Sequence, residues 1–275
     1  MNAHGWVEVA DRVLVRRYPT LDVNVTLVVG DGAALLVDTL SSPAQAAALA
    51  AAVRAVTSAP LTVVNTHHHF DHCFGNATFA PVSGGVWAHS RCAEHLREHG
   101  KALWHAAGEE FPDLATELAD VVVTPPDREV NDSVDLDIGG RRALLRYTGR
   151  GHTDNDIAVL IPDAGVTLTG DLVEVGAPPA FDDSWPLEWA PTLAELLALS
   201  AAEGADTVFV PGHGATTGAY YVRAQHADLA RLEWLCREGH ADCAPAEEVA
   251  LRSPFGLTAA RSAVRRAYAY LDGRI

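Results

Sequence analysis

The sequence predicts an α+β protein in which two mixed β-sheets are flanked by helices. The chain divides into two halves, and each begins with short apolar strands and ends with helix-forming sequence. No linker rich in Pro, Gly or Ser separates the halves, and 275 residues of 48% hydrophobic content suffice for one large core. We therefore expect residues 1–275 to form one domain, with helices covering both sheets.

The first half begins with apolar runs that alternate with turn residues. Strands are expected in VEVADRVLVRR, NVTLVVGDG and AALLVDT, which span residues 7–17, 24–32 and 33–39. Gly30-Asp31-Gly32 supplies the hairpin turn between the last two. A helix is expected from Ser41-Ser42-Pro43 to about Val56, because Ser caps helix N-termini and Pro fits the first turn.

Two more strands and a helix complete this half. LTVVNT at 61–66 predicts a buried strand, and VWAHS at 86–90 predicts a short one. A helix is expected from Arg91 to about Ala107. A looser segment rich in acidic residues and proline follows it.

The second half also begins with strands. They are expected in SVDLDIGG, RRALLRYTG, NDIAVLIPDAG and VTLTGD, between residues 133 and 171. Gly139-Gly140 and Ala164-Gly165 mark turns between them.

Helices dominate the remainder of the chain. After Pro191 a helix is expected in TLAELLALSAAEG at 192–204, followed by a strand at the start of TVFVPGHG at 207–214. Two C-terminal helices are then expected, from about Ala219 to Glu238 and from about Thr258 to Leu271.

The charge of the chain argues against nucleic-acid binding. Its formal net charge is −16, whereas nucleic-acid binding relies on Lys and Arg that neutralise phosphates. No apolar run reaches the roughly 18 residues of a membrane-spanning helix, and neither a secretory signal nor a lipidation motif is found. With four cysteines and no CxxC pair, we expect a cytoplasmic protein without membrane association.

Side chains that can bind metal crowd the stretch VVNTHHHFDH at residues 63–72, directly behind an apolar run. Alternate side chains of a strand point to the same side, so His67 and His69 can converge on one metal ion. Asp71 and His72, one turn further on, can face a second ion. Imidazole and carboxylate suit zinc, with iron or manganese as alternatives. Taken alone, these residues also fit a His-rich surface tract.

Three further motifs place His or Asp next to glycine at the end of a predicted strand. They are Gly151-His152-Thr153, Thr169-Gly170-Asp171 and Pro211-Gly212-His213-Gly214. Glycine lets the backbone turn sharply, and sites are commonly built in loops at strand ends. A surface tract needs no such partners, so these motifs favour a site for two metal ions.

In order and spacing, these motifs resemble those of the metallo-β-lactamase-fold superfamily. The match consists of HxHxDH at 67–72, the His of GHT, the Asp of TGD and the His of PGHG. It covers the chain from the strands before Asp38 to His213, and the helices from about residue 219 are less diagnostic. The resemblance implies a four-layer αβ/βα sandwich with metals at one edge, without assigning a subfamily.

The resemblance also implies a ligand set and a chemistry. The implied ligands are His67, His69 and His152 for the first metal, Asp71, His72 and His213 for the second, and Asp171 as a bridge between both. Two Zn²⁺ ions would lower the pKa of a shared water and polarise a carbonyl. The expected reaction is therefore hydrolysis of an acyl compound by a metal-bridging hydroxide. Asp171 and Asp71, which could pass a proton to the leaving group, are the catalytic candidates.

Three residues are candidates for holding the ligands in place. Asp38 in LLVDT matches an Asp that the family carries at the end of an early strand, and it is expected to orient ligands through hydrogen bonds. Thr66 and Thr153, each next to a ligand, are candidates for the same role. An ordinary polar role in a turn is the alternative for all three.

Substrate contacts are expected from His68 and from three aromatic residues. His68 points away from its neighbours if the segment is extended, which leaves substrate contact or plain exposure. Phe181, Trp185 and Trp189 lie in APPAFDDSWPLEWAP, just after Asp171, and could form an apolar wall of a pocket. Packing of a proline-rich loop onto the core is the alternative.

The motifs fall between named subfamilies. GRGHTDNDIAV resembles a segment of subclass B1 β-lactamases, but those enzymes carry Cys where this chain has Asp171. HxHxDH with a bridging Asp looks more like glyoxalase-II-type thioesterases and lactonases. Glyoxalase-II-like enzymes usually read GHTxGH, and in this chain Asp156 stands at the second His of that pattern. We therefore expect cleavage of a small-molecule ester, lactone or thioester, with β-lactams also open.

The residues of the chain fit other activities of the same fold less well. A persulfide dioxygenase would hold one iron with two His and an Asp, and the full set of seven ligands argues against it. The acidic composition argues against a phosphodiesterase or nuclease. A purely structural metal site is disfavoured because such sites are closed and usually rich in cysteine. The sequence leaves the oligomeric state and the natural substrate open.

Overall fold

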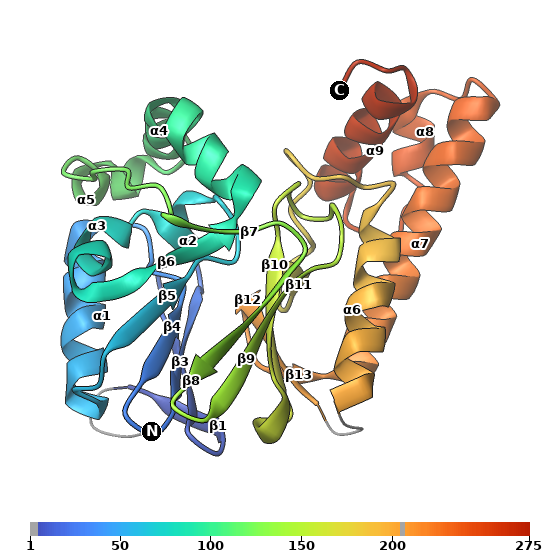
Figure 1. Ribbon diagram of the computed structural model, residues 1–275. Coiled ribbons are helices and arrows are strands. Elements are labelled where there is room, and N and C mark those ends of the chain that lie inside the picture. The colour runs from blue at the N-terminus through green and yellow to red at the C-terminus, as the bar shows by residue number, and fades with distance from the viewer. Residues whose placement is uncertain (1–4, 204–206) are drawn as a thin grey trace.

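The computed structural model describes residues 5–203 and 207–275. Within these ranges the strands form two sheets that pack face to face, and helices cover the outer face of each sheet (Figure 1). The layers therefore follow the order helices, sheet, sheet, helices. This confirms the predicted α+β sandwich.

The first sheet is mixed and comes from the first half of the chain. Its first four strands pair antiparallel, and the last four pair parallel to one another. The carboxyl ends of the parallel strands therefore meet at one edge of the sheet. In spatial order the strands are β1 (Val7–Ala10), β2 (Val13–Arg17), β3 (Asn24–Val29), β4 (Ala34–Val37), β5 (Leu61–Val64), β6 (Ser83–His89) and β7 (Arg128–Val130).

The second sheet comes from the second half of the chain. Its strands pair antiparallel except for the neighbours β11 and β12, which run parallel and end at the same edge. In spatial order the strands are β13 (Thr217–Gly218), β12 (Val208–His213), β11 (Val166–Glu174), β10 (Ile157–Ile161), β9 (Arg141–Tyr147) and β8 (Ser133–Ile138).

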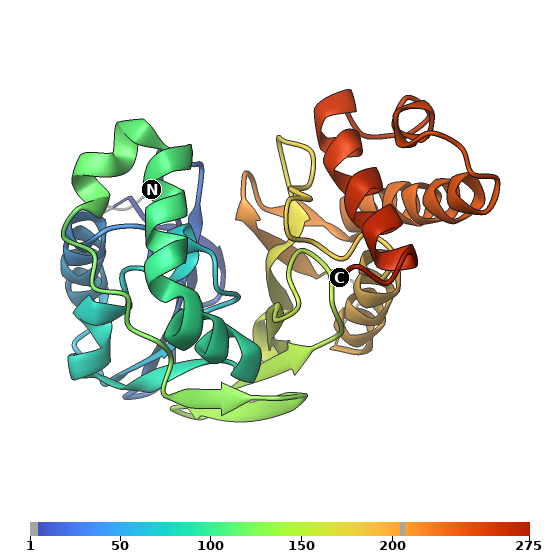
Figure 2. The same ribbon diagram turned by 90° about the horizontal axis from the view of Figure 1, so that it is seen from above.

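Helices on the two sides enclose the pair of sheets. Figure 2 shows the green helix α4 on the side of the first sheet and the red helix α9 on the side of the second. The first side carries α1 (Pro43–Val56), α2 (Phe70–Cys73), α3 (Asn76–Phe79), α4 (Ser90–Glu110) and α5 (Ala115–Leu118). The second side carries α6 (Trp189–Glu203), α7 (Ala219–Ala241), α8 (Ala246–Ala250) and α9 (Leu257–Leu271).

The central strands read as continuous apolar runs because both of their faces are buried. Leu35 points into the core between the sheets, whereas its neighbour Leu36 packs on the side of α1. In the second sheet Leu145 points between the sheets, and Leu144 faces the side of α6 and α7. Such side chains each contribute about 1.5–3 kcal/mol on burial, so this double burial fixes the register of both sheets.

Several predicted elements have different limits in the structure. VEVADRVLVRR forms two strands, β1 and β2, because the chain reverses at Arg12, whose φ is +53°. Helix α4 runs three residues past Ala107, and the short helix α8 was not predicted. The helix predicted from residue 192 already begins at Trp189, with Pro191 in its first turn, and Gly204 lies outside the described residues.

The prediction that residues 1–275 form one domain, with its C-terminal helices from about residue 219, stays a prediction.

No helix within residues 5–203 and 207–275 is both long and apolar enough to cross a lipid bilayer.

A buried arginine ties the two sheets together. Arg141 opens β9 and is 4% exposed. Its Nε donates to Asp163 Oδ2 at 2.8 Å, and its Nη2 donates to Asp11 Oδ2 at 2.9 Å. Asp11 lies in the turn between β1 and β2, so the arginine of one sheet holds a turn of the other.

We predict that Arg141→Ala lowers the free energy of unfolding by about 2 kcal/mol, because charged hydrogen bonds and a buried side chain are lost. Urea denaturation would measure this change. The matched control is Arg142→Ala, whose side chain is 64% exposed and which should stay within about 0.5 kcal/mol of the wild type. Equal effects of the two substitutions would contradict the prediction.

Candidate metal centre

The first motif lies in a turn and a short helix rather than along a strand. Strand β5 ends at Val64, and the following residues turn into α2. His67 lies in this turn, His69 is the residue before the helix, and His72 lies within it. The predicted reason for the convergence of His67 and His69, alternation along a strand, is therefore wrong. The turn brings these side chains together.

The remaining candidate ligands come from the second sheet. His152 lies in the loop after β9, and His213 is the last residue of β12. Asp171 lies inside β11, which continues to Glu174 beyond the predicted end. The pairing of β11 with β12 is irregular from Leu168 to Glu174, and this irregular stretch contains Asp171.

Two motif glycines are required by close approaches at this edge. Gly170 has a φ of +49°, in the left-handed region that side-chain-bearing residues rarely adopt. A Cβ at Gly212 would lie 1.7 Å from Asp171 Oδ1. Glycine at 212 is therefore needed for the carboxylate of Asp171 to occupy its place.

Four candidate ligands form a first group. His69 Nδ1 lies 2.8 Å from His152 Nε2. Asp171 Oδ2 lies 3.4 Å from His152 Nε2 and 3.7 Å from His67 Nε2. One ligand atom from each of the four residues falls within 4.8 Å of the others.

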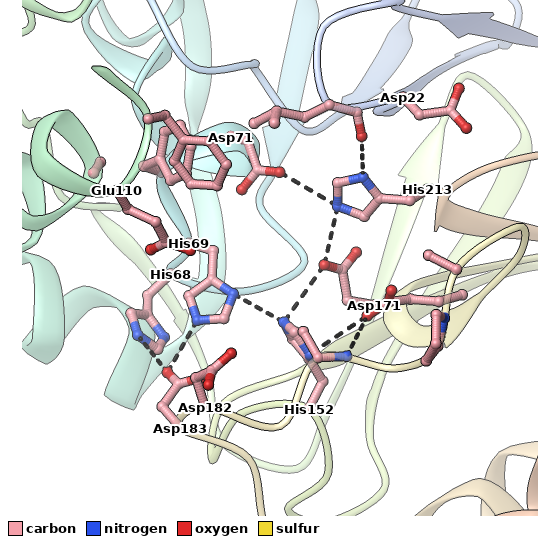
Figure 3. Close-up of a pocket in the computed structure, with 18 of the residues that line it drawn as sticks. Asp22, His68, His69, Asp71, Glu110, His152, Asp171, Asp182, Asp183 and His213 are labelled. Carbon is pink, nitrogen blue, oxygen red and sulfur yellow. Dashed lines mark hydrogen bonds and ion pairs between the residues drawn. The ribbon is translucent and has the colours of Figure 1, made fainter. Parts of the chain in front are cut away.

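Three further candidates form a second group beside the first. His213 Nε2 lies 3.3 Å from Asp71 Oδ2 and 3.3 Å from His72 Nε2. Asp171 reaches this group as well, because its Oδ1 lies 3.3 Å from His72 Nε2. Its Oδ2 lies 3.2 Å from His213 Nε2 (Figure 3). Asp171 thus lies between the two groups, where the resemblance expects a bridging ligand.

The chemistry of these atoms fits divalent metal ions. Within the described residues, His67 Nε2 and Asp171 Oδ1 are buried without a hydrogen-bond partner. A buried polar atom left unpaired costs about 1–3 kcal/mol, and a bound cation would remove this cost. Burial by itself raises the pKa of Asp171, but the charges of His213 and His72 outweigh it and hold the pKa well below its usual value. The carboxylate is therefore available as a ligand, and imidazole with carboxylate is a donor set that zinc uses.

Asp38 and Thr66 orient two of the histidines. Asp38 Oδ2 accepts a hydrogen bond from His72 Nδ1 at 2.8 Å, and its two oxygens also accept from the backbone N–H and hydroxyl of Thr66. The Thr66 hydroxyl lies 3.0 Å from His67 Nδ1. These contacts occupy the Nδ1 atoms, so the Nε2 atoms of His67 and His72 face the centre.

Thr153 has a different place from the one that was predicted. Its hydroxyl accepts a hydrogen bond from the backbone N–H of Asn155, and its own N–H donates to Asp156 Oδ2. These bonds shape the loop that carries His152. They do not involve the imidazole of that residue.

Asp183 is a site residue that the sequence analysis missed. Its Oδ2 lies 2.9 Å from His69 Nε2 and 3.6 Å from His68 Nε2, and the three residues form a further His/Asp group (Figure 3). Burial raises the pKa of Asp183, but the charge of His69 and its hydrogen bond outweigh this and lower the pKa. Because Asp183 occupies Nε2 of His69, Nδ1 faces His152. The loop sequence FDDSW contains a candidate carboxylate, but nothing in its spacing points to His69.

A cavity of about 820 Å³ opens above these residues. Candidate ligands from both groups line it, together with apolar side chains of α4 and of the segment after β11. The apolar lining residues include Phe70, Leu103, Phe111, Val175 and Pro178. The cavity thus combines polar groups at the candidate metal centre with apolar surface beside it, as small-molecule sites do.

The predicted aromatic wall is wrong. Phe181 and Trp189 are 1% and 0% exposed and belong to the core beneath the second sheet. Trp189 Nε1 donates to the Leu172 carbonyl, and its ring lies 5.7 Å from that of His152. Trp185 stacks against the guanidinium of Arg150 at 3.9 Å. The loop folds back onto α6 and α9, which buries its large rings and leaves smaller residues facing the cavity.

His68 does line the cavity, and contacts with Asn155 and His95 hold its ring in place. Its Nδ1 lies 2.9 Å from Asn155 Nδ2, and its ring stacks on that of His95 at 4.7 Å. Substrate contact by His68 stays a prediction.

The chain belongs to the metallo-beta-lactamase superfamily. The sequence model of that family matches residues 18–221, which include all seven candidate ligands. This confirms the family that the motifs indicated.

The similar proteins include enzymes of several kinds. A hydroxyacylglutathione hydrolase from Maricaulis maris (strain MCS10) is 27% identical over 188 residues, which cover 68% of this chain and 62% of the relative. A metallo-beta-lactamase from Pontibacter korlensis has a TM-score of 0.67 at 17% identity, covering 82% of this chain and 98% of its own. The sec-alkylsulfatase Pisa1 from Pseudomonas sp. has a TM-score of 0.75 at 18% identity, covering 97% of this chain and 50% of its own. At these identities the structural likeness shows the fold.

We predict that Asp183→Asn weakens metal binding by about 10–100-fold, because His69 loses the carboxylate that fixes its orientation. Competition with a chromogenic chelator would measure the affinity. The control is Asp120→Asn, which removes the same charge from an exposed residue in the turn after α5. Unchanged affinity in Asp183→Asn would contradict the prediction.

The close approach between Gly212 and Asp171 predicts that metal binding is sensitive to a side chain at residue 212. Gly212→Ala should lower metal content, because the added methyl group collides with the carboxylate of Asp171. Elemental analysis of the purified protein would measure the loss. Gly218→Ala is the control, since a Cβ there meets no atom within 4 Å. Full metal content in Gly212→Ala would show that Asp171 is not held as described.

Proposed function

We propose that this protein is a zinc-dependent hydrolase that cleaves a carboxylic acyl bond of a small molecule. The observation that carries this proposal is the position of Asp171 between two groups of His and Asp residues that line one cavity. Membership of the superfamily and the hydroxyacylglutathione hydrolase relative support hydrolysis. The aligned region spans 62% of that relative, so the activity is proposed for this chain from its own site.

The proposed cofactor is a pair of Zn²⁺ ions. The first would be held by His67, His69 and His152, the second by Asp71, His72 and His213, with Asp171 shared. Iron or manganese would fit the same donor types. When bound, two such ions lower the pKa of water toward neutrality and polarise a carbonyl oxygen.

Two carboxylates of the chain are proposed to take part in the reaction itself. Asp171 and Asp71 are the proposed catalytic carboxylates. Burial raises the pKa of Asp71, but His72 and His213 outweigh it and lower the pKa to about 2, so Asp71 is ionised at neutral pH. Its Oδ2 faces the histidines, and we propose that Oδ1 accepts a proton and passes it to the leaving group.

The positions of the supporting residues agree with a site that must be held rigid. Asp38, Thr66 and Asp183 would fix the imidazole rings before substrate arrives. Preorganised ligands cost no rearrangement during the reaction. His68 would contact substrate at the side of the cavity nearest α4.

The seven-residue set favours this proposal over a persulfide dioxygenase, which would need one iron and three ligands. The exposed acidic residues Glu110 and Asp182, which line the cavity, argue against phosphodiesters and sulfate esters, which carry negative charge.

We predict that the zinc-loaded protein hydrolyses at least one acyl member of a panel containing a lactone, a thioester, an aryl ester and a β-lactam. Asp171→Ala should bind fewer than the expected two metal ions and lose at least about 100-fold in kcat/KM, because both groups of ligands share this carboxylate. Initial rates and elemental analysis on the same samples would test this.

Two outcomes would overturn the proposal. Equal rates for the wild type and Asp171→Ala would show that hydrolysis does not use this centre. One iron per chain together with oxidation of a persulfide would replace the hydrolase by the oxygenase of the same fold.

A further inference from the structure

The charged side chains of the cavity are strongly unbalanced. Seven carboxylates line it, two of them candidate ligands, and among the described lining residues Arg17 is the one Lys or Arg. Apart from the candidate ligands, the lining acids are Asp22, Glu110, Glu174, Asp182 and Asp183. Figure 3 shows labelled acids on several sides of the space in front of His69 and His152.

Three of these acids already have partners inside the protein. Arg17 donates to both oxygens of Asp22, so these two charges offset each other. Asp183 is paired with His69, as described above. Glu174 is 7% exposed and accepts the backbone N–H of Ala180. Each of the three is therefore held by a contact within the protein.

Glu110 and Asp182 differ from these three, because within the described residues neither carboxylate accepts a hydrogen bond from a cation or a backbone N–H. Glu110 is exposed at the end of α4, and within the described residues no cation is recorded against it. Asp182 Oδ1 accepts a hydrogen bond from the neutral hydroxyl of Ser262 at 2.8 Å. Arg266 donates to the backbone carbonyls of Asp182 and Ser184, and it does not line the cavity. Glu110 thus lies on the side of the first sheet and Asp182 on the side of the second, and both line the same cavity.

Apolar surface adjoins both carboxylates. Leu103, Ala106 and Phe111 line the cavity beside Glu110, and Ala177 and Pro178 line it in the segment that leads to Asp182. A molecule in this space therefore meets hydrophobic contacts together with negative charge.

We propose that this cavity selects acyl substrates that combine an apolar body with a positively charged group, and that Glu110 and Asp182 determine this specificity. This deepens the proposed function and rests on it. Opposite charges attract and like charges repel, so the two carboxylates favour a cationic molecule in the cavity. The same carboxylates act against anionic molecules such as glutathione thioesters, whose glutathione part bears two carboxylates.

Three matched thioesters of one apolar acid test the proposal. Their thiols are thiocholine, the uncharged isostere 3,3-dimethylbutane-1-thiol and the anion 3-mercaptopropionate. We expect kcat/KM to fall by about tenfold from the first to the second and by about tenfold again to the third. Raising the ionic strength from about 0.01 M to about 0.5 M should shrink these ratios, because salt screens exposed charges.

Charge-neutral variants assign the effect to residues. Glu110→Gln and Asp182→Asn should each reduce the ratio of thiocholine to mercaptopropionate ester several-fold, and the double variant should bring it close to the ratio that hydroxide alone gives for the two esters. Glu109→Gln is the matched control, because Glu109 is exposed on the same helix and does not line the cavity. This control should keep the wild-type ratio.

The results separate the two proposals. Hydrolysis of the uncharged ester with no preference for thiocholine, or with a preference that the double variant leaves unchanged, would overturn the charge selection alone. Hydrolysis of none of the three esters would count against the acyl-hydrolase proposal. In that event, calorimetry with the corresponding non-cleavable thioethers decides the charge selection, since the cationic thioether should bind at least several-fold tighter than the anionic one.

Discussion

The arrangement of this protein depends on Asp171, whose carboxylate lies between two groups of buried histidines. Charges and imidazoles can be buried together only when each is paired or bound to a ligand. Two sheets supply the partners, because strands of both end at the same edge and carry His and Asp there. The close backbone at Gly212 follows from the same requirement, since the carboxylate needs that space.

Contacts behind the histidines set the direction of their ring nitrogens. Asp38 and Thr66 hold Nδ1 of His72 and His67, so those residues present Nε2. Asp183 holds Nε2 of His69, so that residue presents Nδ1. Three separate chain segments therefore determine which atoms face the centre. This explains why carboxylates that bind no metal themselves matter to a site of this kind.

Two kinds of charge would meet in the cavity. The proposed metal ions would add positive charge at the histidines, where an acyl oxygen would develop negative charge. The carboxylates of Glu110 and Asp182 line the same cavity together with apolar side chains. The proposed chemistry and the proposed selection of substrate thus depend on different residues, and an acyl hydrolase could change its substrate at the opening without altering the ligand set.

The sequence by itself determined the layered fold, the family and the set of candidate ligands. Each rests on local patterns, such as apolar runs buried on both faces and His or Asp beside glycine at strand ends. The tertiary structure decided the pairing of Asp183 with His69, the burial of Phe181 and Trp189, and the acids that line the cavity. These depend on contacts between residues far apart in the chain, such as 69 and 183. Their geometry is set by how the loops fold onto α4, α6 and α9, which no short motif encodes.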